Sequence, residues 1–346
     1  HAIGIYGLTQ ALLQIPFGML SDRIGRKPVI IAGLLLFAAG SVIAAMADNI
    51  YWIIAGRALQ GSGAIAAAVM ALLADLTSEA HRTKAMATVG ASIGLAFTTA
   101  LVLGPLLNEW FGVPGIFWLT AMLALGGVLV ILFVVPNPEH LWQHRDAEPV
   151  AGQFGAVLRN FELLRLDFGI FVLHLAMTAF FLAFPLLLRD LGSIAVGDHW
   201  KIYLPVLLLA LALMIPFIIL AEKYGRMKQV FVGAIALLLL SLAAIALLAS
   251  GKWSLILWLL LYFTAFNLLE ATLPSLVSKV APVTGKGTAM GVYSTSQFAG
   301  AFVGGIAGGW VHHAFGLYAV FLFLALLVTL WLLLAIAMKP PAQPIM

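Results

Sequence analysis

A short charged motif occurs twice in this chain, 200 residues apart. Residues 15–28 read IPFGMLSDRIGRKP and residues 215–228 read IPFIILAEKYGRMK. A second pair of segments repeats further along, where 84–112 and 288–316 share Ala-Met near the start and Phe-Gly at the end. The duplication predicts two halves of similar architecture, each with a charged turn between two helices.

Composition places these halves in a lipid bilayer. Hydrophobic residues make up 63% of the chain, charged residues make up 9%, and the mean hydropathy is +1.09, which excludes an ordinary soluble domain. The apolar runs are continuous rather than alternating, so they predict membrane-spanning helices and not a β-barrel. We expect eleven spans, at 2–21, 28–47, 51–75, 84–108, 113–135, 167–189, 201–221, 228–249, 254–279, 287–312 and 315–338.

Lysines and arginines fall mainly on one side of these spans. Of the 18, 14 lie in loops and a tail on the side of the two charged turns, three lie on the opposite side, and Arg57 lies inside a span. The positive-inside rule assigns the first side to the cytoplasm. The C-terminus is then cytoplasmic, and the basic residues flank a membrane rather than form a nucleic-acid-binding face.

The expected spans divide unequally around a long loop, with five before it and six after it. In the repeat, helix 201–221 pairs with helix 2–21, so we expect the partner of helix 167–189 to precede residue 1. Residues 153–165 of the loop are amphipathic and predict a helix lying along the inner membrane surface. The expected divisions are an N-terminal bundle at 1–135, a cytoplasmic linker at 136–166, a C-terminal bundle at 167–338 and a tail at 339–346.

These motifs resemble the signatures of the major facilitator superfamily, and the resemblance covers the whole chain. The family pattern G-x-x-x-D-R-x-G-R-[KR] between its second and third helices is complete here, as is R-x-x-Q-G-x-G in its fourth helix. A Gly-rich pattern in the fifth helix of the drug–proton antiporter branch is matched only in part, through Gly90, Gly94, Gly104 and Pro105. The matching residues are Gly18, Asp22, Arg23, Gly25, Arg26 and Lys27 in the first pattern, Glu222, Lys223, Gly225 and Arg226 in its repeat, and Arg57, Gln60, Gly61 and Gly63 in the second pattern.

The resemblance implies an all-α integral membrane fold of two pseudo-symmetric helical bundles, with the first of twelve helices missing from this sequence. It implies a secondary active transporter that works by alternating access in the bacterial inner (plasma) membrane. We expect a monomer without a cofactor that uses the proton gradient to export small hydrophobic or cationic compounds. Two alternatives stay open: a proton-coupled importer or facilitator of a polar metabolite, and a non-transporting membrane receptor of the same fold.

The first charged turn is a candidate gating latch. Helix 287–312 starts at the cytoplasmic face, so its N-terminal dipole favours an anion there, and we expect Asp22 to dock on it while Arg26 holds Asp22 in place. The repeat predicts a mirror latch between Glu222 and the start of helix 84–108. The simpler interpretation is that these charges only orient the loop.

Two ionisable residues inside the spans are candidates for proton coupling. Arg57 lies about two turns into its helix, where an unpaired arginine is costly, so it must face a wet cavity or a partner. In the antiporters that the chain resembles, this arginine is tied to proton coupling. Glu270 is the only carboxylate well inside an expected span, and burial disfavours its charge, so it is a candidate proton carrier. A cation-binding role and simple hydrogen bonding to a neighbouring helix are its alternatives.

Other polar and small residues within the spans have simpler candidate roles. The polar side chains are expected to contact substrate, although a lone histidine in a span is more often a packing residue. Glycines at intervals of four are expected to let helices pack closely, and a Gly-Pro pair is expected to kink its helix. The substrate candidates are Tyr6, Gln10, Gln14, Gln60, His174, Asn267 and Gln297, and the packing and kink candidates are Gly300, Gly304, Gly308, Gly104 and Pro105.

No pattern in the chain predicts an enzyme. The chain has no cysteine, its histidines lack metal-ligand spacing, and no Gly-rich phosphate loop follows a strand. We therefore expect no catalytic residue and no metal site.

Overall fold

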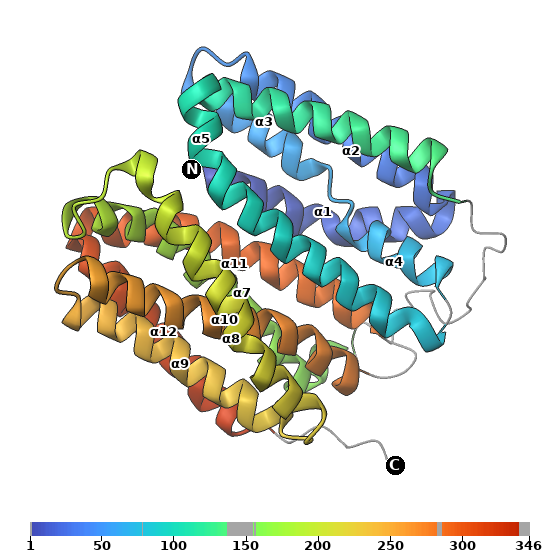
Figure 1. Ribbon diagram of the computed structural model, residues 1–346. Coiled ribbons are helices and arrows are strands. Elements are labelled where there is room, and N and C mark those ends of the chain that lie inside the picture. Colours follow the sequence, from blue (N-terminus) through green and yellow to red (C-terminus); the bar gives the residue numbers. More distant parts are fainter. Residues whose placement is uncertain (1, 78, 137–154, 156, 282–285, 339–346) are drawn as a thin grey trace. The chain divides into compact units, whose positions relative to one another are not determined.

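The computed structural model describes residues 2–77, 79–136, 155, 157–281 and 286–338 (Figure 1). Regular structure in these ranges is helical. The chain forms two compact units, unit 1 (His1–Phe154) and unit 2 (Gly155–Met346). The duplicated sequence predicted two halves of this kind.

Unit 1 contains α1 (Ala2–Ile24), α2 (Arg26–Ala45), α3 (Ile50–Ser62), α4 (Ala66–Leu76) and α5 (Glu79–Phe133). Within the unit, α2 packs against α3 and α5, and α1 packs against α3. The turn between α1 and α2 is made by Gly25 at φ 96°, a left-handed conformation that glycine adopts without strain. Asn49 begins α3 by accepting hydrogen bonds from the backbone N–H groups of Tyr51 and Trp52.

The span expected at 51–75 is found at Ile50–Met70, but its helix is interrupted, and α3 and α4 lie on the two sides of the interruption. Residues 63–65 between them are not helical. Gly63 lies so close to the backbone of α2 that a Cβ atom built on it would meet Gly33 O at 2.3 Å. Hydropathy could not show this interruption, since residues 50–70 as a whole are apolar enough to cross a membrane.

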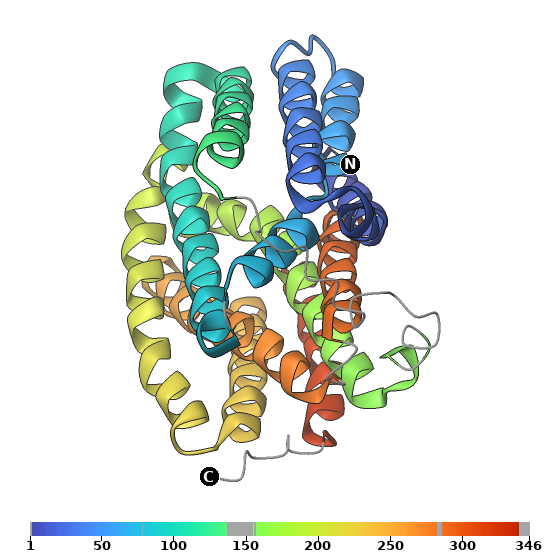
Figure 2. The ribbon, with the colours of Figure 1, turned by 90° about the vertical axis from the view of Figure 1, so that its right-hand side faces the viewer.

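The two spans expected at 84–108 and 113–135 form the two arms of α5. The backbone leaves helical geometry at Gly112 (φ 65°, ψ −179°), and the ribbon reverses direction between the arms (Figures 1 and 2). The helix runs on through Gly104 and Pro105, so the break in backbone geometry lies further along the chain than the Gly-Pro pair.

Unit 2 contains α7 (Phe161–Asp190), the short 3-10 helix η2 (Val196–Asp198) and five further long helices. The most extensive packing in the unit is between α7 and α11, and α10 packs against α8 and α9. Buried aromatic rings fill the core, where Phe180 of α7 stacks on Tyr262 of α10 with 4.0 Å between ring centroids. The five helices are α8 (Trp200–Glu222), α9 (Met227–Leu248), α10 (Lys252–Val280), α11 (Lys286–Phe315) and α12 (Leu317–Ile336).

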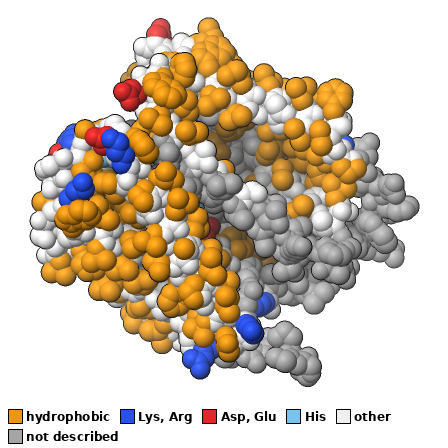
Figure 3. All heavy atoms as spheres, viewed as in Figure 1, with side chains coloured by type: hydrophobic (Ala, Val, Ile, Leu, Met, Phe, Trp, Pro, Cys, Tyr) orange, Lys and Arg blue, Asp and Glu red, His pale blue; other side chains and the backbone are white. Residues whose placement is uncertain are grey.

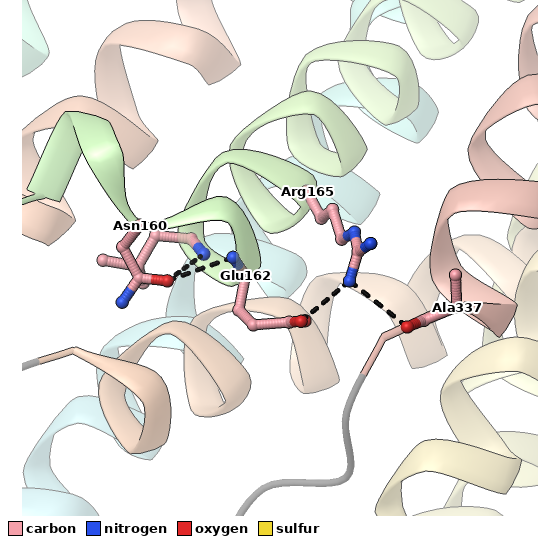
Figure 4. A network of polar contacts seen from close by, with 5 residues as sticks. Asn160, Glu162, Arg165 and Ala337 are labelled. Atoms are coloured by element: carbon pink, nitrogen blue, oxygen red, sulfur yellow. Dashed lines mark hydrogen bonds and ion pairs between the residues drawn. The ribbon is translucent and has the colours of Figure 1, made fainter.

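The amphipathic helix expected at 153–165 is interrupted at Asn160, which caps the start of α7. The Asn160 side chain accepts hydrogen bonds from the N–H groups of Glu162 and Leu163 (Figure 4). Arg165 then donates to Glu162 Oε1 at 2.7 Å and to the carbonyl of Ala337 at 3.2 Å, which ties the first turn of α7 to the end of α12. An amphipathic pattern does not predict such a cap, because Asn160 falls on the polar face whether the helix is continuous or begins after it.

Eight helical segments within the described residues are long and apolar enough to cross a membrane. Many large apolar side chains on them are exposed, as expected of surfaces that face lipid rather than water. Hydrophobic side chains cover most of the coloured surface in Figure 3. The segments are Arg26–Ala45, Ile50–Met70, Leu103–Phe133, Phe161–Asp190, Val196–Ala221, Met227–Leu248, Lys252–Val277 and Leu317–Ile336.

Candidate functional site

Three helices of unit 2 bring together three of the candidate residues. Gln297 Nε2 on α11 lies 2.8 Å from Nε2 of His174 on α7. Glu270 Oε1 on α10 lies 3.4 Å from the same nitrogen. His174 is 8% exposed, whereas the Glu270 side chain keeps 33% of its surface. We call His174, Glu270 and Gln297 the polar triad.

Glycines on α11 make this meeting possible. Cβ atoms built on Gly300 and Gly304 would meet the carbonyl oxygens of Phe171 and Leu175 at 2.1 and 2.4 Å. One built on Gly308 would meet Ala179 Cβ at 2.7 Å. The two backbones therefore approach closely along several turns, which small residues at this spacing permit.

The Nε2 atom of His174 can form a hydrogen bond with only one of Gln297 and Glu270 at a time. The Nε2 atom of a histidine either carries a proton and donates or has a lone pair and accepts. It therefore cannot accept a hydrogen bond from the Gln297 amide while donating one to the Glu270 carboxylate. The tautomer of His174 thus decides which of these two neighbours its Nε2 atom can bind.

Asn267 lies one turn before Glu270 but does not join the triad. Its Nδ2 atom is buried and makes no hydrogen bond within the described residues. The aromatic residues on the same helix, Tyr262, Phe263 and Phe266, are buried in the core of unit 2.

Unit 1 carries its own line of polar groups on α1. Gln10 donates to Tyr6 Oη at 3.2 Å, and Gln14 donates to Gln10 Oε1 at 2.7 Å. Gln14 Oε1 in turn accepts from the backbone N–H of Ala67 at 3.2 Å. Gln10 and Gln14 are buried, so their hydrogen-bonding groups serve the unit itself.

Arg57 extends this line to α2 and α5. Its guanidinium lies 4.5 Å from the centre of the Tyr6 ring and donates to Gln60 Oε1 at 3.0 Å. Gln60 donates to Ser41 Oγ at 2.6 Å, and Thr120 donates to the same oxygen at 3.2 Å. Sequence reasoning did not find Ser41 and Thr120, because a hydroxyl residue in a span gives no signal of its own.

Gly61 of the second family pattern brings α3, which carries Arg57 and Gln60, close to α1. A Cβ atom on Gly61 would meet Thr9 Oγ1 at 1.9 Å and the carbonyl of Tyr6 at 2.5 Å. The backbone of α3 therefore lies directly against α1 at the level of the Tyr6 ring. This approach lets a side chain on α3 reach an aromatic face on α1.

The first charged turn is described only in part. The side chains of Asp22, Arg23 and Glu222 lie outside the described residues, as do those at the starts of α5 and α11, so both expected latches stay predictions. Gly18 faces Ala67 of α4, where its Cβ position is 3.5 Å from that methyl group. Gly225 has φ 65°, which matches the left-handed turn at Gly25 in the first half.

Arg26 makes a contact that the sequence did not suggest. Its Nε atom lies 3.2 Å from Oδ2 of Asp75 on α4, and its Nη1 donates to Ser21 Oγ at 2.7 Å. Lys27 next to it donates to the carbonyl of Val135. The cations of this turn thus bind α1, α4 and the end of α5, whereas Arg226 in the repeat is exposed.

Apolar helices in two repeated units, with polar groups buried among them, define a multi-pass membrane transporter. The family model of the Major Facilitator Superfamily matches residues 1–192 and again residues 166–345. The chain belongs to this family and is a secondary transporter, not an enzyme.

Individual relatives agree with this assignment. The chain is 52% identical over 340 residues to the inner membrane transport protein YajR of Escherichia coli, covering 98% of this chain and 75% of that protein. It is 29% identical over 205 residues to the multidrug resistance protein MdtL of E. coli, covering 57% and 51% of the two chains. The crystal structure of the human organic anion transporter MFSD10 matches with a TM-score of 0.74 and 23% identity, covering 96% of this chain and 83% of that one, and shows the same fold.

Proposed function

We propose that this chain is a proton-coupled antiporter that exports small hydrophobic or cationic compounds by alternating access. The observation that carries the proposal is the position of Glu270 in the polar triad. The carboxyl group lies inside a membrane-spanning unit beside His174, and no lysine or arginine among the described residues pairs with it. A carboxyl group in such surroundings is suited to take up and release a proton during a transport cycle.

The triad gives this proton a structural consequence. When Glu270 is ionised, His174 Nε2 donates to it, and the Gln297 amide loses its acceptor. When Glu270 is protonated, the imidazole proton moves from Nε2 to Nδ1, and Nε2 then accepts from Gln297, which links α7 to α11 instead of α10. Proton uptake thus exchanges one interhelical hydrogen bond for another.

Arg57 supports coupling from the other unit. A guanidinium inside a span needs a partner, and the Tyr6 ring and Gln60 supply two here. The name of one relative, a multidrug resistance protein, supports export of drug-like compounds. The charge distribution of the loops supports an orientation with the C-terminus in the cytoplasm.

Reconstituted vesicles test the proposal directly. The protein is inserted into liposomes that contain a pH-sensitive dye, and ethidium or tetraphenylphosphonium is added as a cationic probe. We expect probe flux opposed to proton flux in the wild type and loss of probe-driven proton movement in Glu270→Gln. Glu109→Gln is the matched control, because Glu109 is exposed on α5.

Each other outcome contradicts a defined part of the proposal. Proton-coupled transport by Glu270→Gln at the rate of Glu109→Gln removes Glu270 from the coupling mechanism. Probe and protons moving in the same direction favours the importer. No flux with either probe, or with a polar metabolite, favours the non-transporting receptor.

A further inference from the structure

Asp167 is a buried acid that the proposed mechanism does not use. It lies in the second turn of α7 and is 5% exposed. Both of its carboxyl oxygens are buried and make no hydrogen bond within the described residues. No lysine or arginine of the described part of the chain forms an ion pair with it.

A carboxylate cannot remain charged and unpaired in such surroundings without a large cost, so Asp167 needs a bound proton or a bound cation. A metal ion requires several oxygen ligands at short distance. The described residues contain no group of three or more His, Asp or Glu side chains that could hold one. A proton is therefore the occupant that this site fits.

The position of Asp167 relates it to the polar triad. It precedes His174 by seven residues on the same face of α7, about 10 Å nearer the start of the helix. Tyr293 on α11 precedes Gln297 by four residues and shares its face. Since Gln297 contacts α7, the buried Tyr293 faces the same helix one turn nearer the start of α11.

The other helices packed against α7 add few charges here. α12 has no acidic or basic residue between Leu317 and Ile336. On α10, the titratable and charged residues in the half that follows the aromatic core are Glu270 and the exposed Lys279. Glu162 and Arg165 on α7 pair with each other.

We propose that Asp167 is a second proton-carrying carboxyl group, which passes protons between Glu270 and the cytoplasmic side by way of Tyr293. This rests on the proposed function, because it extends the proton path that begins at Glu270. In the outgoing step the Tyr293 hydroxyl gives its proton to the Asp167 carboxylate and receives the proton of the Glu270 carboxyl group. Tyrosine ends neutral, Glu270 ends as a carboxylate, and Asp167 ends protonated and one step nearer the start of α7.

The sequence contained a signal for this residue. Asp167 and His174 stand seven apart in the otherwise apolar run LDFGIFVLHL, and residues at that spacing lie on one face of a helix. The expected span began at residue 167, so the acid was counted as a flanking residue and not as an internal one.

Infrared difference spectroscopy between acidic and alkaline pH tests the inference without a known substrate. Purified wild-type protein is expected to show two carboxyl C=O components from buried protonated acids. Asp167→Asn should remove one component, Glu270→Gln should remove the other, and the control Glu109→Gln should leave both. In vesicles, Asp167→Asn should bind ethidium as the wild type does but lose at least tenfold in probe-driven proton movement.

Further measurements keep the inference falsifiable if Asp167→Asn does not fold. In wild-type protein labelled with carboxyl-13C aspartate, the C=O frequency of the component assigned to Asp167 should shift. The frequency of the component assigned to Glu270 should not change. Tyr293→Phe should keep both components but slow proton movement.

The failures of the two proposals can be told apart. The inference is overturned if aspartate labelling shifts neither carboxyl component, or if Asp167→Asn moves protons at the wild-type rate. Either result leaves the role of Glu270 intact. A different result is that Asp167→Asn removes its carboxyl component while Glu270→Gln keeps the spectrum and the proton movement of the wild type. This result supports proton exchange at Asp167 and overturns the coupling role of Glu270.

Discussion

Gln14 of α1 accepts a hydrogen bond from the backbone N–H of Ala67, 3.2 Å away, in the first turn of α4. The first N–H groups of a helix have no partner within the helix, and α4 begins inside an apolar region where water is scarce. Ile65, which precedes it, supplies no side-chain cap. Gln14 therefore acts as the missing cap from a different helix, and so holds the interruption between α3 and α4 in place.

Replacing Gln14 by leucine is expected to destabilise unit 1. The leucine has a similar volume but leaves the Ala67 N–H and the side-chain oxygen of Gln10 without these partners, at a cost of about 1–3 kcal/mol for each unsatisfied group. Thermal unfolding of the detergent-solubilised protein measures the loss as a lowered Tm. Leu12→Met on the exposed face of α1 is the control, and an equal Tm for the two variants would refute the capping role.

The contact between Arg57 and Tyr6 is expected to be a favourable cation–π pair. A double-mutant cycle with Arg57→Gln and Tyr6→Leu should give a coupling free energy of about 0.5–2 kcal/mol, because the pair is partly buried. Tyr6→Phe keeps the ring face and loses only the hydrogen bond from Gln10, so it should retain most of the coupling with Arg57. Additive effects of the two substitutions on stability would show that the ring and the guanidinium do not interact.

The helices were largely predictable from the sequence, because a helix that crosses a bilayer needs a long apolar run. The charged turns show where several of these helices end. What escaped prediction depends on backbone contact between helices. At the interruption at 63–65 the backbones of Gly61 and Gly63 lie directly against α1 and α2, a contact that hydropathy does not predict. The cap at Asn160 escaped for a similar reason, since one hydrogen-bonding side chain outweighs a continuous amphipathic pattern.

The polar triad was predictable as three residues but not as a group. His174, Glu270 and Gln297 each stand out as polar within an apolar run, yet they lie on three helices far apart in the sequence. Only the rotation of each helix about its axis decides whether such residues meet. The repeat could not help either, because it relates each helix of one unit to a helix of the other and not to its own neighbours.

The ion pair between Arg26 and Asp75 is expected to contribute modestly to stability. Its side chains are 14% and 27% exposed, so water weakens the attraction, and a cycle with Arg26→Ala and Asp75→Ala should give a coupling of about 1 kcal/mol or less. Raising the salt concentration should reduce that coupling further. A coupling of several kcal/mol that does not change with salt would mean that the pair is fully shielded from solvent.

Gly304→Ala is expected to separate α7 from α11 and so to disturb both stability and the polar triad. A Cβ atom at this position would lie 2.4 Å from Leu175 O and 2.8 Å from Leu175 Cα, and backbone atoms cannot yield as a flexible side chain can. Overpacking of this kind typically costs about 1–3 kcal/mol, and the shift needed to relieve it would lengthen the 2.8 Å contact between His174 and Gln297. Gly291→Ala on the same helix is the matched control, because nothing lies within 4 Å of its Cβ position and alanine favours a helix over glycine. We therefore expect a lower Tm and weaker probe-driven proton movement in Gly304→Ala, and an unchanged or slightly higher Tm in Gly291→Ala. If both variants keep the wild-type Tm and proton movement, the close approach of α7 and α11 is not what positions the triad.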